Sequence, residues 1–438
     1  MLEKEFPKLR SDLYRIYLMG INANKAKPFQ TLHCNISKVE FMMLVAALCL
    51  NHEFSVGPKE SSITYILDYL NTGVISSKVG NIPDVYSFYY LSECKEGMRA
   101  FVTRTMEDSN KRLKKLSLSY QKISSEREGN LITLYSLFAK YYIFLEEYAR
   151  GNAWMEKEIW KVQHEIEKCI DDMNWDHEDK LTIWKNHYFN SNWKKEFIEQ
   201  KGDFWQDRWC QLARVVLQLR SVKRFSQAID IVEENVLVHT WELILITDAM
   251  VRFLQEQGEE VDRNQVFLRV FYHDFGESSG NDIISDVKVF SDFTKAYFDT
   301  LVSEDEKRLK GQIGESAYQW MSLYKKGASG YIADILDKLV GLMKVYIEIY
   351  FFNNINFLSV LKTNYLERLM KFLDISRIKN FQHPLFLKEL MDYMYITNQE
   401  EILSLYGDTL SYYYSNEEVE EMYQVLDRIH KDNNRDGM

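Results

Sequence analysis

Apolar side chains recur at steps of three and four residues along most of this chain. Leu131, Leu134, Leu137, Phe138 and Tyr141 form one such stripe, within a long charged stretch from residue 98 to residue 173. This spacing places apolar side chains on one face of an α-helix. Further along the chain, the same pattern predicts helices at about 204–224, 236–257, 263–274, 286–302, 304–326, 330–352, 355–375 and 385–435.

Proline is scarce and unevenly placed. Four of the five prolines lie before residue 84 and the fifth is Pro384, so residues 84–383 contain none. A proline inside a helix removes an amide donor and clashes with the preceding turn. The gap therefore favours long contiguous helices, and we predict an all-α fold. Residues 1–100 are expected to alternate helices with loops, which Pro28, Pro58 and the turn before Pro83 mark.

The formal net charge is −11, and no block of the sequence is rich in lysine or arginine. A protein that binds duplex nucleic acid usually needs a basic surface to displace counterions from the phosphates. The composition therefore disfavours nucleic-acid binding. Net acidity is typical of a soluble surface that repels its own copies.

The five cysteines are scattered, and none forms a C-x-x-C pair. They indicate neither a disulfide framework nor a thiolate zinc site, and buried thiols in a reducing compartment explain them. The N-terminus carries charges throughout, without the apolar region of a signal peptide. The longest purely apolar run, Phe41 to Leu50, is about half a membrane span. We expect a cytoplasmic protein with no membrane partner.

The dipeptide His273-Asp274 carries two groups that bind borderline divalent ions such as Mn²⁺, Co²⁺, Fe²⁺ or Zn²⁺. Neighbouring side chains diverge on a regular helix, so both can face one ion only where the helix ends. We expect Asp262 to cap this helix and Gly276 to let the backbone leave helical geometry after the dipeptide. Alone, the dipeptide is a weak signal because it often arises by chance.

Two other predicted helices offer groups that complete a set of ligands. His239 lies in the first turn of a helix that Asn235 is expected to cap. Asp337 lies in the apolar run around Ile335 and Leu339, where an unpaired carboxylate would be costly. The alternatives are a core histidine with satisfied hydrogen bonds at position 239 and an aspartate paired with a buried lysine or arginine at position 337.

Taken together, these elements resemble the HD-domain superfamily, and specifically the bacterial 5′-deoxynucleotidases of the YfbR type. The family pattern runs Arg-Trp, Glu-Asn-Val-x-x-His-Ser, His-Asp-x-x-Glu, Gly-Asp-x-x-x-x-Val-Lys and a late Ala-Asp. This chain reads Lys223-Arg224-Phe225, ENVLVHT from Glu234, HDFGE from His273, NDIISDVK from Asn281, and Leu336-Asp337. The resemblance covers about residues 205–350 and implies an HD-domain helical bundle.

The resemblance also implies a role for each matching residue. Four residues would hold one divalent ion, which is Mn²⁺, Co²⁺, Fe²⁺, Zn²⁺ or Mg²⁺: His239, His273, Asp274 and Asp337. Glu277 would orient or deprotonate the attacking water, and Asp282 would contact the sugar side of the substrate. Arg224 would clamp the phosphate, next to Phe225 and Lys288 in the substrate pocket. A guanidinium is a natural partner for phosphate.

The chain departs from the family pattern where the nucleoside would bind. Phe225 replaces the family tryptophan, Asn281 separates Gly280 from Asp282, and Ser285-Asp286 replaces Thr-Pro. The base, sugar and phosphate-chain preferences therefore stay open.

Our leading hypothesis is a metal-dependent nucleotide phosphohydrolase that releases phosphate from deoxynucleoside 5′-monophosphates. The second is a dNTP triphosphohydrolase, which the large N-terminal region favours and Glu277 disfavours, because such enzymes usually carry a histidine there. A cyclic-nucleotide or alarmone hydrolase is a third. A non-catalytic helical binding protein with an HD remnant is the fourth, and the complete ligand set argues against it.

We predict three parts in the chain. Residues 1–201 form a helical accessory region for regulation or oligomerisation, residues 202–375 form the HD phosphohydrolase domain, and residues 376–438 form a C-terminal helical extension. The expected partners are a nucleotide substrate and further copies of the chain in a homo-oligomer.

Overall fold

The structure is a computed structural model. It describes residues 5–25, 29–30, 35–56, 63–79, 126–173, 208–225, 229–279, 307–360 and 400–435, with residues 291, 300, 304, 393 and 397. The fold is all-α, as predicted. In the described part of the chain, β-structure is limited to β1 (Phe29–Gln30), which pairs antiparallel with β2 (Asn35–Ile36), and an isolated bridge between Lys223 and Asn235.

The N-terminal helices are α1 (Glu5–Asn24), α2 (Lys38–Val56), α3 (Thr64–Val79), α6 (Glu126–Ala149) and α7 (Met155–Asp172). The central helices are α11 (Arg208–Leu219), α12 (Val236–Glu256), α13 (Arg263–Tyr272), the 3₁₀ helix η3 (Phe275–Ser279), α16 (Glu315–Ser322) and α17 (Gly327–Tyr346). The π-helix η4 (Ile347–Phe351) and the 3₁₀ helix η5 (Ile355–Val360) follow, and η7 (Gly407–Tyr412) and α21 (Asn416–Arg435) end the chain.

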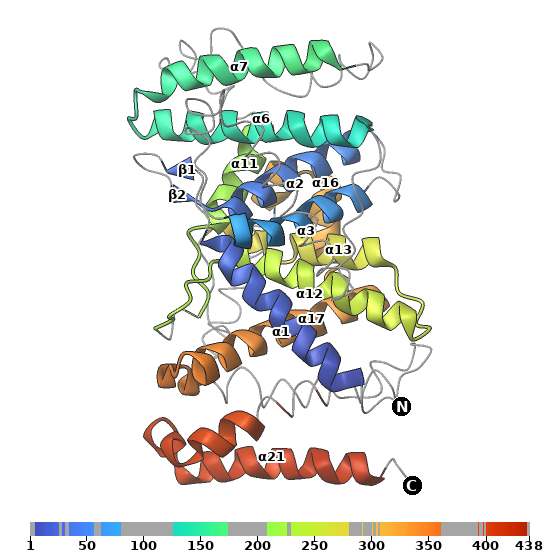
Figure 1. Cartoon of the computed structure of the whole chain (residues 1–438), viewed down its shortest axis with the longest axis vertical. Helices are drawn as coiled ribbons and strands as arrows, with labels where there is room; N and C mark the ends of the chain where they lie inside the picture. The colour runs from blue at the N-terminus through green and yellow to red at the C-terminus, as the bar shows by residue number, and fades with distance from the viewer. Residues whose placement is uncertain are drawn as a thin grey trace.

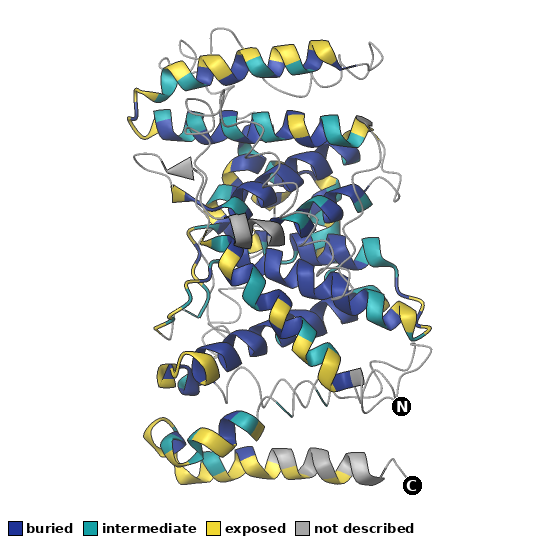
Figure 2. Cartoon of the chain, viewed as in Figure 1, coloured by how far each residue is buried: buried dark blue, intermediate teal, exposed yellow. Residues whose placement is uncertain are grey.

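The core is built around helices that are apolar on nearly every side. α2 is buried from Val39 to Glu53 without interruption, and α12 is buried from Val236 to Val251. A helix that is apolar all round is stable only when other helices cover each face. Figure 2 shows these buried helices in the middle of the molecule, with exposed residues on α7 and α21 at its two ends.

The helices stack along the long axis of the molecule (Figure 1). α6 and α7 lie at one end and α21 lies at the other. α2 packs against α3, α6 and α11, while α12 packs against α13 and α17. α1 crosses this stack and packs against both α3 and α12. The N-terminal helices therefore share one hydrophobic core with the central helices.

Trp241 of α12 is the largest fully buried side chain among the described residues and connects these two groups of helices. Its indole N–H donates to the carbonyl oxygen of Leu70 in α3 at 3.1 Å. α3 approaches closely because Gly73 has no side chain, since a Cβ atom there would lie 2.8 Å from the indole ring. Gly20 of α1 also lies against this indole, since a Cβ atom there would be 3.2 Å from the ring.

Several predicted helices are interrupted. The helix expected at 304–326 is broken at Gly314, where φ is +89°, and α16 starts after it. The helix expected at 385–435 gives way to η7 and a turn before α21. The stretch at 98–173 contains α6 and α7, separated at Gly151, where φ is +97°. Positive φ values favour glycine and end a regular helix. The helix expected at 286–302 lies outside the described residues apart from residues 291 and 300.

α2 is the helix, among those described, that is long and apolar enough to cross a membrane. However, 83% of its apolar window is buried inside the protein. Such burial is typical of the core helix of a soluble protein. A capping box marks the start of this helix. Ser37 and Glu40 exchange hydrogen bonds there between side chain and backbone, at 2.6 and 3.1 Å.

Candidate metal centre

α12 begins where the sequence predicted, because Asn235 caps it. The side-chain oxygen of Asn235 accepts a hydrogen bond from the backbone N–H of Val238 at 2.9 Å. Just before this cap, Glu234 accepts a backbone hydrogen bond from Arg224 at 3.1 Å. The bridge between Lys223 and Asn235 holds the two segments antiparallel. This pairing brings Arg224 next to the first turn of α12, which carries His239.

The second element is the end of α13, which Asp262 caps as predicted by accepting from the Gln265 backbone N–H at 3.0 Å. The helix ends at Tyr272, and a turn at His273 and Asp274 leads into η3. Our prediction that Gly276 ends the helix was wrong. Gly276 lies inside η3 without a positive φ, and the tightening from α to 3₁₀ geometry supplies the irregularity instead.

The structure brings the four predicted ligands together from three helical elements. One nitrogen or oxygen atom from each of His239, His273 and Asp274 lies within 4.8 Å of the others. His239 Nε2 lies 3.0 Å from Asp337 Oδ1 in α17, and His273 Nε2 lies 2.8 Å from Asp274 Oδ2. His273 Nε2 and Asp337 Oδ1 are 3.9 Å apart. Three of these side chains are at most 7% exposed and Asp274 is 16% exposed.

This donor set fits a divalent ion. At metal–ligand distances of about 2.0–2.2 Å, neighbouring ligand atoms lie roughly 3 Å apart, close to the observed 2.8 and 3.0 Å. His273 Nε2 is buried, and no described group gives it a hydrogen bond of acceptable geometry, although Asp274 Oδ2 is 2.8 Å away. Two imidazoles and two carboxylates form a donor set that suits a borderline divalent ion.

Each histidine is oriented through its other ring nitrogen. His273 Nδ1 lies 2.7 Å from the carbonyl oxygen of Val270, which can only accept, so Nδ1 carries a proton and Nε2 is the nitrogen directed at the cluster. His239 Nδ1 lies 3.0 Å from Glu234 Oε1, so it would donate to this carboxylate when Nε2 binds an ion. Carboxylate–histidine pairs of this kind orient metal ligands and raise their basicity.

Buried charges determine the electrostatics of the cluster. Burial raises the pKa of Glu234, but the hydrogen bond with His239 and nearby positive charges outweigh it and lower the pKa to about 2. Burial also raises the pKa of Asp337, but the Lys338 ammonium and His239 hold it well below its usual range. Burial acts similarly on Asp274, where His273 and Arg224 keep the pKa low. These carboxylates are therefore ionised at neutral pH.

Arg224 lies among these carboxylates. Its guanidinium contacts Asp274 Oδ2 at 3.2 Å, Asp337 Oδ1 at 3.8 Å and Glu234 Oε1 at 4.0 Å. Burial lowers the pKa of Arg224, but the surrounding carboxylates, including Glu277, raise it above its usual value. The next residue, Phe225, has a φ of +54°, which is rare for a bulky side chain and is typical of functional sites.

Glu277 lies one turn beyond the His273-Asp274 pair. Its backbone N–H donates to the Asp274 carbonyl oxygen at 2.9 Å, and a 3₁₀ turn brings positions i and i+3 to the same face. The negative charge of Glu277 also helps to raise the pKa of Arg224. Phe225 packs against Phe357 with ring centroids 5.7 Å apart. Asp282 and Lys288 lie outside the described residues, so their roles stay predictions.

Sequence reasoning missed three residues that contact the ligands. Glu234 was part of the recognised pattern, but we assigned it no role. Lys338 pairs with Asp337 through its Nζ atom, and the Tyr324 ring packs on His273 with centroids 5.0 Å apart. The position of Glu234, directly before a capping residue and five residues before a candidate ligand, could have indicated its role. No local pattern indicates the role of Tyr324.

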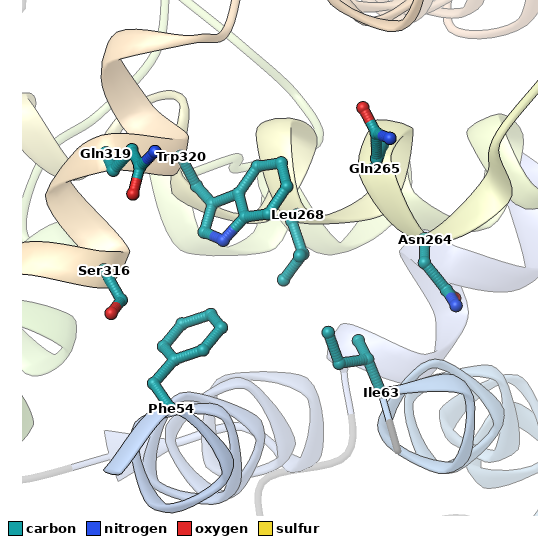
Figure 3. A pocket seen from close by; sticks show the side chains of 8 residues that line it. All are labelled: Phe54, Ile63, Asn264, Gln265, Leu268, Ser316, Gln319 and Trp320. Carbon is teal, nitrogen blue, oxygen red and sulfur yellow. The ribbon is translucent and has the colours of Figure 1, made fainter. Parts of the chain in front are cut away.

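A separate hollow lies between α2, α13 and α16 (Figure 3). Phe54 and Trp320 face each other across it, and Ile63 and Leu268 lie to one side. Its described lining residues are otherwise amides and a serine, without an ionisable group. This hollow therefore offers no acid, base or ion ligand, and we assign the chemistry to the cluster of histidines and aspartates.

The family comparison covers this cluster. Residues 211–391 match the family described as 5′-deoxynucleotidase YfbR-like. The resemblance found from the sequence is thereby confirmed at family level, and YfbR-like proteins act on nucleotides. The matched segment begins within α11 and contains all four candidate ligands, but it leaves out α1 to α7. No curated protein and no solved structure matches the chain.

Proposed function

We propose that this protein is a metal-dependent phosphohydrolase that releases phosphate from 2′-deoxynucleoside 5′-monophosphates. The convergence of His239, His273 and Asp274 within 4.8 Å, with Asp337 against His239, carries the proposal. These residues come from segments that are far apart in the sequence, and His239 and Asp337 are separated by 98 positions. The match to a family of 5′-deoxynucleotidases supports the substrate class.

His239, His273, Asp274 and Asp337 would hold the ion. When bound, a divalent ion lowers the pKa of a coordinated water and polarises a phosphoryl oxygen. The remaining steps belong to side chains of this chain. Arg224 binds the substrate phosphate, because its guanidinium is buried beside the ligands and stays charged. This contact strengthens as negative charge builds up on the phosphoryl group, so it lowers the barrier as well as aiding binding.

Glu277 accepts a proton from the attacking water. Its place on the turn after Asp274 supports this role, because a base must lie within hydrogen-bond reach of the water it activates. Asp282 and Lys288 would contact the sugar and the rest of the substrate, as the family pattern implies. Phe225, held by Phe357, would form one wall of the nucleoside pocket.

The test is a substrate screen with the full chain. Deoxy- and ribonucleoside mono-, di- and triphosphates are incubated with Mn²⁺ or Co²⁺, and with a chelator as control, and products are separated by chromatography. Inorganic phosphate and nucleoside from monophosphates are the expected products. Intact tripolyphosphate from dNTPs would select the triphosphohydrolase alternative.

Two variants link the activity to the site. Asp274→Ala should lose the bound ion, and Glu277→Ala should keep the ion while turnover falls by roughly 10²–10⁴-fold, the usual scale for loss of a general acid or base. Glu260→Ala, at an exposed position before α13, is the matched control and should remain fully active. A wild-type protein that binds no divalent ion and turns over no nucleotide would contradict the proposal.

A further inference from the structure

The two residues directly before α12 are both held by helices from the N-terminal region. The hydroxyl of Tyr17, in α1, donates to Glu234 Oε2 at 2.9 Å. The side-chain amide of Asn235 donates to Glu40 Oε1, in α2, at 2.8 Å. α1 and α2 lie outside the segment that matches the nucleotidase family. The start of the helix that carries His239 is thus fixed by a part of the chain that lies outside the family match.

Tyr17 and His239 contact opposite oxygens of the same carboxylate. Glu234 Oε2 accepts from Tyr17, while Glu234 Oε1 lies 3.0 Å from His239 Nδ1. All three side chains are buried, with exposures of 1% for Tyr17, 4% for Glu234 and 0% for His239. Hydrogen bonds to an ionised acceptor in such surroundings are shorter and stronger than neutral ones. A continuous chain of contacts therefore runs from α1 to the imidazole.

Holding both oxygens fixes the plane of the carboxylate. With Oε1 directed at Nδ1, the His239 ring keeps the orientation in which Nε2 lies 3.0 Å from Asp337 Oδ1. Without the tyrosine hydroxyl, Oε2 would be left buried beside the Tyr17 ring and the carboxylate could rotate towards other donors. Groups that orient a metal-ligating histidine typically change metal affinity by about 10–100-fold when they are removed.

We propose that Tyr17 is a positioning residue of the metal centre, acting through Glu234 on His239, so that α1 is part of the site. This inference rests on the proposed function, because it requires an ion at His239. It also gives the N-terminal region a direct role in the chemistry, beyond regulation or oligomerisation.

Titration of the metal-free full chain with Co²⁺ tests the proposal, because the visible absorption of bound Co²⁺ reports both affinity and ligand geometry. Tyr17→Phe removes one oxygen atom and keeps the ring. We expect it to weaken Co²⁺ binding by roughly 10–100-fold and to change the absorption spectrum of the bound ion. Tyr14→Phe is the matched control on the same helix, because the Tyr14 ring packs against Tyr346, with centroids 5.1 Å apart, and not against Glu234. It should bind Co²⁺ as the wild type does.

A double-mutant cycle with Glu234→Gln distinguishes positioning from general destabilisation. If Tyr17 acts through Glu234, Tyr17→Phe causes little further loss of Co²⁺ affinity in the Glu234→Gln background. If Tyr17→Phe does not fold, Glu234→Gln tests the contact between Glu234 and His239 instead. This variant keeps Tyr17 and should weaken Co²⁺ binding.

The outcomes separate the two proposals. If the wild type binds no Co²⁺, the metal centre and this inference fall together. If the wild type binds Co²⁺ and Tyr17→Phe binds it with the same affinity and spectrum, only this inference is overturned. Losses that multiply independently in the double variant would likewise show that Tyr17 does not act through Glu234.

Discussion

Glu242 provides a quantitative test of the electrostatics inside this core. It lies on α12, is 2% exposed, and packs against Gly20 of α1. Burial raises the pKa of its carboxyl well above the usual value of 4.5, and the negative charge of Glu234 raises it further. The carboxyl is therefore protonated in the folded protein at pH values where it is ionised in the unfolded chain.

The sign of the effect on stability follows from this difference. Above pH 4.5 the unfolded chain releases a proton that the folded protein retains. The free energy of unfolding then falls as the pH rises, by at most ~1.4 kcal/mol per pH unit, until the pH passes the folded pKa. Glutamine cannot ionise, so a Glu242→Gln protein should lack this decline. Between pH 5 and pH 7 its stability relative to wild type should increase by up to ~3 kcal/mol.

Urea denaturation of the metal-free proteins at pH 5, 6 and 7 measures this difference. Glu256→Gln, an exposed position on the same helix, is the control and should show no such trend. Only the change of this stability difference with pH reports the ionisation of Glu242, because the cost of burying the amide is the same at each pH. A stability difference between Glu242→Gln and wild type that stays constant from pH 5 to pH 7 would refute the reasoning.

Three further predictions test the core and the site. Lys344→Met should lower the free energy of unfolding by about 3–5 kcal/mol, because the Glu348 carboxylate would stay buried without its charge partner. In the wild type this carboxylate lies 2.9 Å from the Lys344 ammonium. An unchanged melting temperature would contradict this prediction. Gly73→Ala should lower the free energy of unfolding by ~1–3 kcal/mol, because the added methyl group clashes with Trp241. Gly129→Ala is the control, since it has open space around it in α6, and thermal melts should show that it stabilises the protein. Arg224→Ala should lower kcat by about 10²–10³-fold for every nucleotide accepted, measured by product chromatography, and a loss confined to KM would argue against transition-state stabilisation.

The sequence predicted best what local chemistry determines. α12 was expected at residues 236–257 and is observed at 236–256, because the Asn235 side chain determines where the helix starts. The four candidate ligands could be chosen from residue type, spacing and family pattern, and the structure brings them together. Helix starts and ligand types are properties of a few neighbouring residues, so they can be inferred without the fold.

The remaining features depend on contacts between distant segments. Tyr17 and Glu234 are 217 positions apart, and nothing near either residue indicates the hydrogen bond between them. Helix breaks were also missed, since Gly314 interrupts a pattern whose apolar spacing continues on both sides. Gly276 was misassigned because a glycine after a helix signals an end, but it does not determine whether the end is left-handed or 3₁₀. The domain boundaries, the oligomeric state and the cytoplasmic location remain predictions.

The packing of α1 and α2 against α12 has a consequence for how the protein is made. Tyr17 of α1 leaves the ribosome well before α12, because Glu234, two positions before this helix, lies 217 residues later in the chain. At about 5–20 residues per second, this interval is roughly 11–43 s. For most of that time the apolar α2, buried from Val39 to Glu53 in the finished protein, lacks α11 and α12, two of the helices that cover it. The nascent chain should therefore bind chaperones strongly, and slowing translation before α12 should increase its aggregation.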